Sequence, residues 1–376
     1  MESKMNLLTK TAPWVVASLL AATSAFGQSS KNQPPQKTFD QGHEMMSNQF
    51  MPAYNAPARI DVRGAWDFYA FGSFTYWQAR QENMEVAFVQ DSRSTFADVD
   101  GNYVNMNFKY KPGFKVGLGM NFDHDNWDAC VLYTWYRGTD SMSTSTNGQS
   151  ALVFPVVGHP EAFDVASYDF GTSSWKLAMD LLDVELARSS YSGMYLTVRP
   201  FFGARAGWIR QYLSAQYDGR QPQFANNNTF SATYKSYSWG IGPRAGLYSN
   251  WILGQGFRLY GNGAADILYT RYTNLSTDSV VVTNATEGDH VHTRQKDIDY
   301  LRTHMELELG IGWGSYFDNN NWHVDMSAGY IYQVFFNQNM FRHFTQETVS
   351  VRSAYGFVPN GDLFVHGLTA SLRFDF

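Results

Sequence analysis

The sequence predicts an all-β protein: a transmembrane antiparallel up-and-down β-barrel of about ten strands, in a range of about 8 to 14. Three observations lead to this prediction. Apolar and polar residues alternate with period two over many segments of strand length. The connections between these segments alternate between short turns and long polar loops. The N-terminus carries the basic and apolar pattern of an export signal.

The N-terminal residues predict export. A basic start precedes an apolar run at 12–23, and Ala25 and Gly27 place small residues at the two positions that signal peptidase reads. The run is shorter than the ~20 apolar residues of a transmembrane helix, and a retained anchor is the alternative. We expect a cleaved signal peptide at 1–27 and then a polar, proline-punctuated, flexible periplasmic segment at 28–63.

The composition excludes several classes of protein. Beyond the signal, no stretch approaches ~18 consecutive apolar residues, which excludes helical membrane spans. Aromatic residues make up 16% of the chain and charged residues also 16%, as expected of strands with one lipid-facing side and aromatic girdles. The net charge of -6 argues against a nucleic-acid partner. Cys130 is the only cysteine, which excludes an intrachain disulfide and a cysteine-based metal site.

Alternating segments follow from residue 64 onward, and we expect the barrel to occupy 64–376. The first, 65–79, has aromatic residues on both faces, so its lipid face is ambiguous. The segments have a length of ~10 to 14 residues, which suits a tilted membrane strand. The remaining predicted strands are 114–122, 127–135, 175–181, 196–208, 239–247, 257–269, 301–313, 322–332 and 363–376.

Two of these strands contain an irregularity. In 175–181 the apolar face opposes Lys176 and Asp180, but the phase becomes unclear over 183–186. Within 196–208, Pro200 cannot donate a hydrogen bond to a neighbouring strand, which indicates a bulge or a locally unpaired position. In every strand we expect the apolar face to meet lipid and the polar face to line the lumen.

The lengths of the connections favour a membrane barrel over a soluble sandwich. Outer-membrane barrels have short periplasmic turns and long extracellular loops, whereas a sandwich has no reason to sort its connections in this way. Two of the loops, near 82–110 and 140–170, are long enough to hold another hairpin. The short turns lie near 123–126, 189–193, 250–256 and 318–321. The long loops lie near 81–112, 138–173, 218–236, 273–300 and 337–362.

The last predicted strand ends on an aromatic residue. Leu368, Leu372, Phe374 and Phe376 share one face at a spacing of two or four residues. This pattern resembles the C-terminal signature that the assembly machinery of the bacterial outer membrane recognises. We therefore expect that machinery to be a partner of this strand. A sandwich strand that happens to end on Phe is the alternative.

Several blocks of the sequence resemble one family. They are GFKVGLG at 113–119, YTW at 133–135, RPFFG at 199–203, WGIGPRAGL at 239–247, LELGIGW at 307–313 and NQNM at 337–340. In their order and spacing these blocks are similar to the Legionella-type major outer membrane protein family, which also occurs in environmental chlamydiae. The resemblance covers essentially the whole barrel region and implies a pore-forming protein of the outer membrane. The cysteine-rich chlamydial major protein has a different pattern.

The predicted inward faces carry charges of both signs. These charges can line an aqueous constriction and set ion preference, or they can pair across a narrow lumen and fill it. About eight strands leave an interior just filled by side chains, and open channels come with ~16, so ten strands lie near the filled end. The candidate lumen-lining residues are Lys115, Asp128, Lys176, Asp180, Arg199, Arg205, Arg244, Arg258, Asp266, Arg302, His304, Glu306, Glu308, Asp325 and Arg373.

The function that these predictions favour is diffusion of small hydrophilic solutes or ions through an outer-membrane porin-like protein. A non-conducting structural or adhesin-like surface barrel, whose loops bind partners, is the alternative. A hydrolase using His290, His292 or His304 is a third class, but no serine has the context of a nucleophile. Outer-membrane lipid and small solutes are the expected partners, with monomer and homo-oligomer both left open. We expect no enzyme activity, cofactor or metal.

Overall fold

The computed structural model describes residues 56–63, 67–90, 100–122, 125–146, 152–158, 168–221, 226–283, 286–348 and 353–376. They belong to one compact unit that begins at Tyr54. The predicted signal peptide at 1–27 lies outside the described residues, as does the predicted periplasmic segment up to residue 55. Within the described part of the chain, no helix has the length and apolar character needed to cross a membrane.

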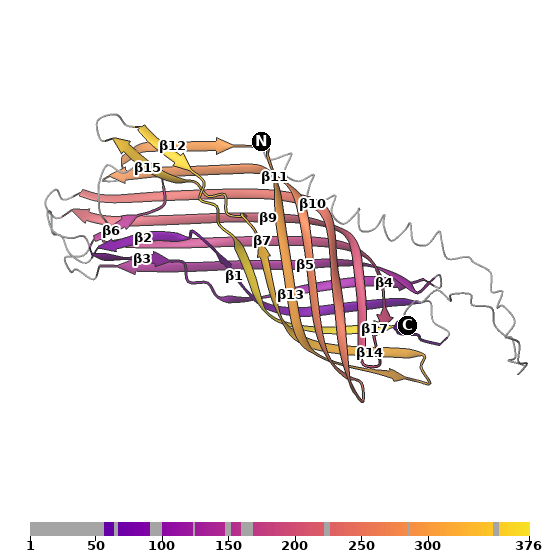
Figure 1. Cartoon of the computed structure of the whole chain (residues 1–376). Helices are drawn as coiled ribbons and strands as arrows, with labels where there is room; N and C mark the ends of the chain where they lie inside the picture. Colours follow the sequence, from indigo (N-terminus) through magenta and orange to yellow (C-terminus); the bar gives the residue numbers. More distant parts are fainter. Residues whose placement is uncertain are drawn as a thin grey trace, which may run out of the picture. The chain divides into compact units, whose positions relative to one another are not determined.

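Ten of the described strands form a closed antiparallel barrel (Figure 1). Each pairs with the next in chain order, and the last pairs with the first, with Leu363 opposite Gln81 and Asp375 opposite Tyr69. The predicted fold class is confirmed. The barrel strands are β1 (Phe68–Gln81), β4 (Tyr110–Asn121), β5 (Trp127–Ser145), β7 (Phe170–Arg188), β9 (Leu196–Gln221), β10 (Asn226–Gly254), β11 (Phe257–Thr283), β13 (Ile298–Phe317), β14 (Trp322–Phe335) and β17 (Leu363–Asp375).

Shorter strands lie in the connections. One of the two long loops proposed to hold a hairpin contains β2 and β3, which form a small sheet with β6 from the other, separate from the barrel sheet. A second hairpin joins β15 to β16, and β12 pairs with the end of β11. These strands are β2 (Glu85–Gln90), β3 (Gly101–Asn105), β6 (Leu152–Pro155), β8 (Ser190–Tyr191), β12 (Thr286–Gln295), β15 (His343–Thr348) and β16 (Ser353–Phe357).

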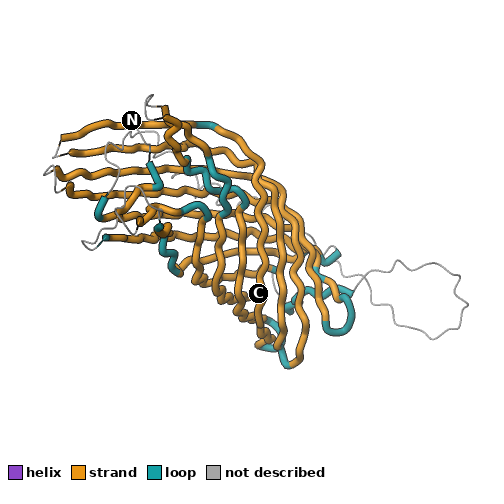
Figure 2. The backbone as a smooth tube through the Cα atoms, turned by 60° about the vertical axis from the view of Figure 1, so that its left-hand side comes forward, coloured by secondary structure: helices purple, strands orange, loops and turns teal. Residues whose placement is uncertain are grey.

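Several barrel strands are much longer than the sequence predicted. β9 has 26 residues, β10 has 29 and β11 has 27, although ~9–11 residues cross a membrane. The long strands run on together beyond the closed part (Figure 1, Figure 2). The predicted loops at 218–236 and 273–300 are therefore mostly strand. The sequence pattern indicates loops there because the outer face of these extensions is polar and carries no lipid-facing apolar row.

The turns at the other end are short and have the expected chemistry. Asp125 and Asn126 have φ of 58° and 59°, the left-handed region that Asn and Asp tolerate best. The turn after β13 likewise has left-handed residues at 318–320. By the rule for outer-membrane barrels, this end is periplasmic. At Pro200 the register with β10 is continuous, without a bulge, whereas the pairing with β7 ends at Phe201.

The described end of the predicted flexible segment lies along this short-turn end. The Ala58 N–H donates to the Ser189 carbonyl at 3.2 Å, and the Arg63 N–H donates to the Asn320 carbonyl at 2.8 Å. The Arg59 guanidinium donates to the Phe122 carbonyl at 3.3 Å. Residues 56–63 are thus held on the rim of the barrel.

The outer surface next to the short turns is an apolar band. Alternate residues such as Leu247, Ile267 and Leu309 are exposed, with Leu309 56% exposed. Their inward neighbours in the chain are small or polar. An apolar surface exposed on every strand is what a hydrocarbon environment requires. Leu368, Leu372, Phe374 and Phe376 are part of this band.

Above the band the arrangement of polar and apolar residues is reversed. Trp175 and Leu177 of β7 point inward and are buried in an apolar core with Tyr136 and Phe230. Residues of the connections complete this core, including Val86 of β2. The Tyr217 hydroxyl donates to the Val86 carbonyl and so ties β2 to β9. The extracellular part of the barrel is therefore filled like a soluble protein.

We expect the boundary between the apolar band and the polar outer face above it to determine where a cation is tolerated. Ala204→Lys on β9 places an ammonium in the middle of the apolar band and should reduce the free energy of unfolding by roughly 2–4 kcal/mol. Ser214→Lys lies on the same face of β9 beyond the band, and should change it by less than about 0.5 kcal/mol. Denaturant unfolding in lipid vesicles measures both. Equal losses in the two variants would place the lipid boundary elsewhere.

Candidate functional site: a charge network in the lumen

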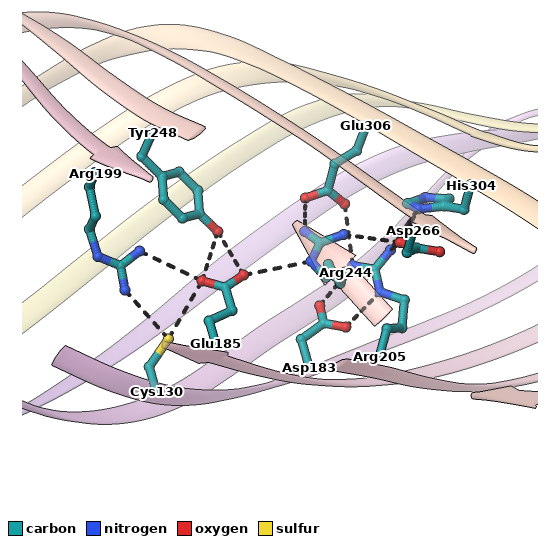
Figure 3. Close-up of polar contacts among 10 residues, drawn as sticks. All are labelled: Cys130, Asp183, Glu185, Arg199, Arg205, Arg244, Tyr248, Asp266, His304 and Glu306. Carbon is teal, nitrogen blue, oxygen red and sulfur yellow. Dashed lines mark hydrogen bonds and ion pairs between the residues drawn. The ribbon is translucent and has the colours of Figure 1, made fainter. Parts of the chain in front are cut away.

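A network of charged side chains crosses the lumen within the apolar band (Figure 3). Period two places these side chains on the inner faces of β5, β7, β9, β10, β11 and β13. Antiparallel register then sets the partners. Asp183 lies directly opposite Arg205, and Arg244 lies directly opposite Asp266. Each arginine faces a glycine on the neighbouring strand, Gly242 and Gly203 respectively, and a Cβ at either glycine would collide with a backbone carbonyl of the next strand, Ile267 or Val184.

Arg205 is the centre of one half of the network. Its Nε donates to Asp183 Oδ1 at 2.6 Å and its Nη2 donates to Asp183 Oδ2 at 2.7 Å, a bidentate pair. Its Nη1 lies 3.1 Å from Asp266 Oδ2 and 2.8 Å from His304 Nδ1. Nη2 also reaches Glu306 Oε2 at 3.3 Å. All three nitrogens of the guanidinium therefore have partners.

Arg244 joins the two halves. Its Nη1 donates to Asp266 Oδ2 at 3.2 Å, and its Nη2 donates to Glu306. Its Nε lies 3.7 Å from Glu185 Oε1. Glu185 in turn accepts a hydrogen bond of 2.9 Å from the Tyr248 hydroxyl. The carboxylates of three strands thus converge on one guanidinium.

The second half of the network lies nearer the short turns. Arg199 binds Asp128, with Nη2 at 2.5 Å from Oδ2, and its Nη1 is 3.6 Å from Glu185. The Tyr69 hydroxyl also donates to Asp128, at 3.0 Å. The Cys130 thiol lies between Glu185 and Arg199, at 3.7 Å from the carboxylate and 3.9 Å from the guanidinium. The single thiol of the chain is therefore inside the lumen.

The remaining predicted lumen residues lie around this network. Arg258 forms a bidentate pair with Asp325, at 2.5 and 2.7 Å. Glu308 accepts a hydrogen bond from Tyr260 at 2.7 Å. Three cations lie over aromatic rings: Lys115 over Trp77, Arg302 over Tyr272 and Tyr300, and Arg373 over Tyr69. Arg373 also binds Asp375 at 2.5 Å.

The structure corrects two of the predicted lumen residues. Lys176 and Asp180 lie on the outer face of β7, because the apolar residues that alternate with them, such as Trp175, fill the core above the membrane. Sequence analysis missed Asp183 and Glu185 for the same reason. Both continue the inward phase of Trp175, and the apparent loss of phase at 183–186 is the point where the apolar residues change sides.

The network closes the lumen. Asp183, Glu185, Arg205, Arg244, Asp266 and His304 are each no more than 2% exposed. Just above them, a space between Leu181, Leu268 and Phe335 has a volume of ≈ 10 Å³, about the room that one water needs. The three arginines meet five carboxylates: Asp128, Asp183, Glu185, Asp266 and Glu306. In formal charge the constriction is acidic.

Four histidines, including the three considered for hydrolysis, lie in different places. His304 is buried inside the network and is 2.8 Å from Asp266. His290 and His292 are exposed on β12, with both rings directed at Asp278 of β11. His323 is bound to Asp375 beside the short turns, at 3.1 Å. Across the described residues, no three His, Cys, Asp or Glu side chains are grouped to hold a metal.

Comparison with known proteins identifies the family. The sequence model of the Legionella pneumophila major outer membrane protein precursor matches residues 61–376, which is nearly all of the barrel unit. The chain belongs to this family. Its members are outer-membrane proteins, and the chain is accordingly a β-barrel of the bacterial outer membrane. No curated protein matches the sequence.

Solved structures similar to this family member are distant. The outer membrane protease OmpT from Escherichia coli is 8% identical with a TM-score of 0.38, over 85% of this chain and 99% of that chain. The toluene transporter TodX from P. putida is 11% identical with a TM-score of 0.30, over 83% and 90%. A major outer membrane protein from Thermus thermophilus is 12% identical with a TM-score of 0.24, over 81% and 99%. At these values none of them indicates an activity for this chain.

Proposed function

We propose that this barrel is a gated pore for small ions or hydrophilic solutes, and that the lumen network is its constriction. The observation that carries the proposal is the connection of three arginines and five carboxylates in one network, in which all but Arg199 and Glu306 are buried. A buried ion pair is seldom more stabilising than apolar residues of the same volume. A barrel that needed only stability would be filled as its extracellular part is filled.

Opening requires two rearrangements. The network must separate enough to admit water, and β2 with the 336–342 segment must leave the mouth of the barrel, where Val86 and Phe341 are part of the apolar core. Opening must break the polar contacts that hold these connections, such as the Asn339 amide to the Glu82 carbonyl at 2.8 Å and the Gln338 amide to the Ser238 hydroxyl at 3.1 Å. Once open, the acidic constriction should favour cations over anions.

A second candidate function is a non-conducting surface barrel. The apolar core across the extracellular mouth favours it, because a filled mouth supports an extracellular sheet without any passage. Single-channel recording in planar bilayers distinguishes the two. The pore predicts stepwise conductance and a cation-selective reversal potential, and it predicts weaker selectivity in Glu306→Gln. Silent bilayers with folded protein, for both wild type and Glu306→Gln, would reject the pore in favour of the surface barrel.

Cys130 provides an independent measurement of opening. The thiol is buried between Glu185 and Arg199, so a charged methanethiosulfonate reagent should label it only while the network is open. We expect slow labelling in wild type and at least about tenfold faster labelling in Glu306→Gln, which loses the charge that holds Arg244 and Arg205. Glu308→Gln, whose carboxylate binds Tyr260 instead, is the matched control. Equal labelling rates in all three proteins would contradict the assignment of the constriction.

A further inference from the structure

The outer face of β5, β7, β9 and β10 carries an aromatic row at one level. Trp135, Trp208 and Trp239 lie in register across the four strands, with Asp180 between the first two. Aromatic rows of this kind lie at the interface between hydrocarbon and lipid head groups. Since the short turns are at the opposite end, this row marks the outer leaflet.

Cations lie directly above this row. Arg137 and Arg210 are one step further along their strands, and both bind Asp180, Arg137 through two contacts of 2.8 Å and Arg210 at 3.4 Å. A further step along, Lys176 and Lys235 flank Tyr212, and the Lys176 ammonium lies 5.9 Å from the ring centroid. Four cations therefore lie just above the aromatic row on a surface that faces away from the lumen, and two of them bind its one carboxylate, Asp180.

The geometry leaves much of this charge directed outward. Arg137 is fixed, because its Nη1 also donates to the Tyr136 and Met179 carbonyls at 2.8 and 2.9 Å. Arg210 gives a single long contact to Asp180, and its side chain is 49% exposed. On the neighbouring strands β11 and β13 the cation is not in excess, because Arg271 forms a bidentate pair with Asp299 at 2.7 and 2.9 Å.

The surfaces below and above the cations differ in chemistry. Below them, Leu182, Val184 and Ala206 form an apolar strip in the lipid-facing band. Above them, the same outer face is rich in hydroxyl groups. A groove of ≈ 680 Å³ lies there, lined in part by Ser141, Ser174 and Gln216 and bounded on one side by the end of β3 and Asn107 after it.

We propose that this face, the β5–β10 outer face, binds a phosphorylated glycolipid of the outer leaflet. The apolar strip would hold acyl chains, Arg210 and Lys176 with their neighbours would hold phosphate, and the hydroxyl-lined groove would hold sugar. Each layer lies at the depth where such a lipid presents the matching group. A phospholipid would match the acyl and phosphate layers but would leave the hydroxyl-lined groove without a sugar.

Titration of the folded full-length chain with lipid A in detergent micelles tests the proposal, with intrinsic tryptophan fluorescence as the signal. Arg210→Ala combined with Lys176→Ala should weaken binding of the diphosphorylated lipid by roughly 30-fold, at about 1 kcal/mol for each cation. Monophosphorylated lipid A should bind wild type more weakly than the diphosphorylated lipid does. Removal of the two cations should also reduce the affinity for the monophosphorylated lipid by a smaller factor than the affinity for the diphosphorylated lipid. That coupling assigns the cations to phosphate.

Arg80→Ala is the matched control, because Arg80 is an exposed, outward cation on β1, outside the β5–β10 outer face. The affinity of the Arg80→Ala variant for diphosphorylated lipid A should stay within about twofold of that of wild type. Heat-modifiable gel migration verifies that each variant is folded. Unchanged affinity in the double variant would overturn the proposal. So would a fluorescence change of the same size with inorganic phosphate alone, because the site would then take a free anion.

Discussion

Arg205→Ala should reduce the free energy of unfolding of the barrel by about 3–5 kcal/mol, the cost of removing one partner from a buried ion pair. The substitution leaves Asp183 without the bidentate partner that it has at 2.6 and 2.7 Å. It also removes a cation from Asp266 and Glu306, at 3.1 and 3.3 Å. The remaining carboxylates would be buried together in a lumen that excludes water. Denaturant unfolding in lipid vesicles measures the loss.

Arg210→Ala is the matched control, since it makes the same substitution five residues further along β9, on the outer face. Arg210 is half-exposed and has one contact of 3.4 Å, so its loss should change the free energy of unfolding by less than about 1 kcal/mol. A similar loss in both variants would mean that the Arg205 pairs are not buried in the folded protein.

A paired replacement separates stability from function. Arg205→Met together with Asp183→Leu removes both charges of the directly opposed pair, and should recover most of the stability that Arg205→Ala loses. If the lumen network is the constriction, this stable variant should still conduct differently from wild type. Recovery of stability with unchanged selectivity would argue that the pair serves only the fold.

The barrel itself could be predicted because its signal is local. Period two identifies the outer face of 301–313 and of 364–376, and short turns such as 318–321 identify the periplasmic end. These features depend on neighbouring residues only. The ten-strand count followed from them, and the structure confirms it. The additional strands β2, β3 and β6 are short and pair with one another in a separate sheet, so the alternation of the barrel strands did not predict them.

The length of the long strands could not be predicted with the same rule. The rule assumes that an apolar outer face marks a strand, and this holds only where the outer face meets lipid. Beyond the band, β10 keeps its inward phase at Phe230 and Tyr234, but the outer face is polar. The apolar residues there belong to a core inside the barrel. The sequence alternates in both the membrane band and the extracellular extension. In the band the apolar residues face outward, and in the extension they face inward.

The ion-pair partners within the charge network also could not be predicted from the sequence. Thirteen of the fifteen predicted lumen residues lie on inner faces, which the alternation alone can indicate. Which carboxylate meets which arginine depends on the register between strands and on side chains that cross the lumen, such as Glu306 to Arg244. Neither follows from spacing along one strand. Asp183 was missed because its strand changes from one environment to the other at that point.

Trp175→Ala tests this exchange of faces directly. Trp175 is fully buried in the core, where it packs edge-on against Phe108 and donates to Gln211 at 3.2 Å. Removing a buried tryptophan should cost about 3–5 kcal/mol, because the side chain leaves a cavity and an unpaired amide. Lys176→Ala, its neighbour on the outer face, should change the free energy of unfolding by less than about 0.5 kcal/mol.

The alternative orientation makes the opposite prediction. If Trp175 faced lipid and Lys176 the lumen, as period two on 175–181 alone indicates, truncating the tryptophan would leave no cavity, and truncating the lysine would remove a lumen charge. Unfolding in denaturant, followed for the two single variants and their double variant, decides between the orientations. A large loss for Lys176→Ala with a small one for Trp175→Ala would invert the β7 assignment, and with it the inward placement of Asp183 and Glu185, which are in phase with Trp175.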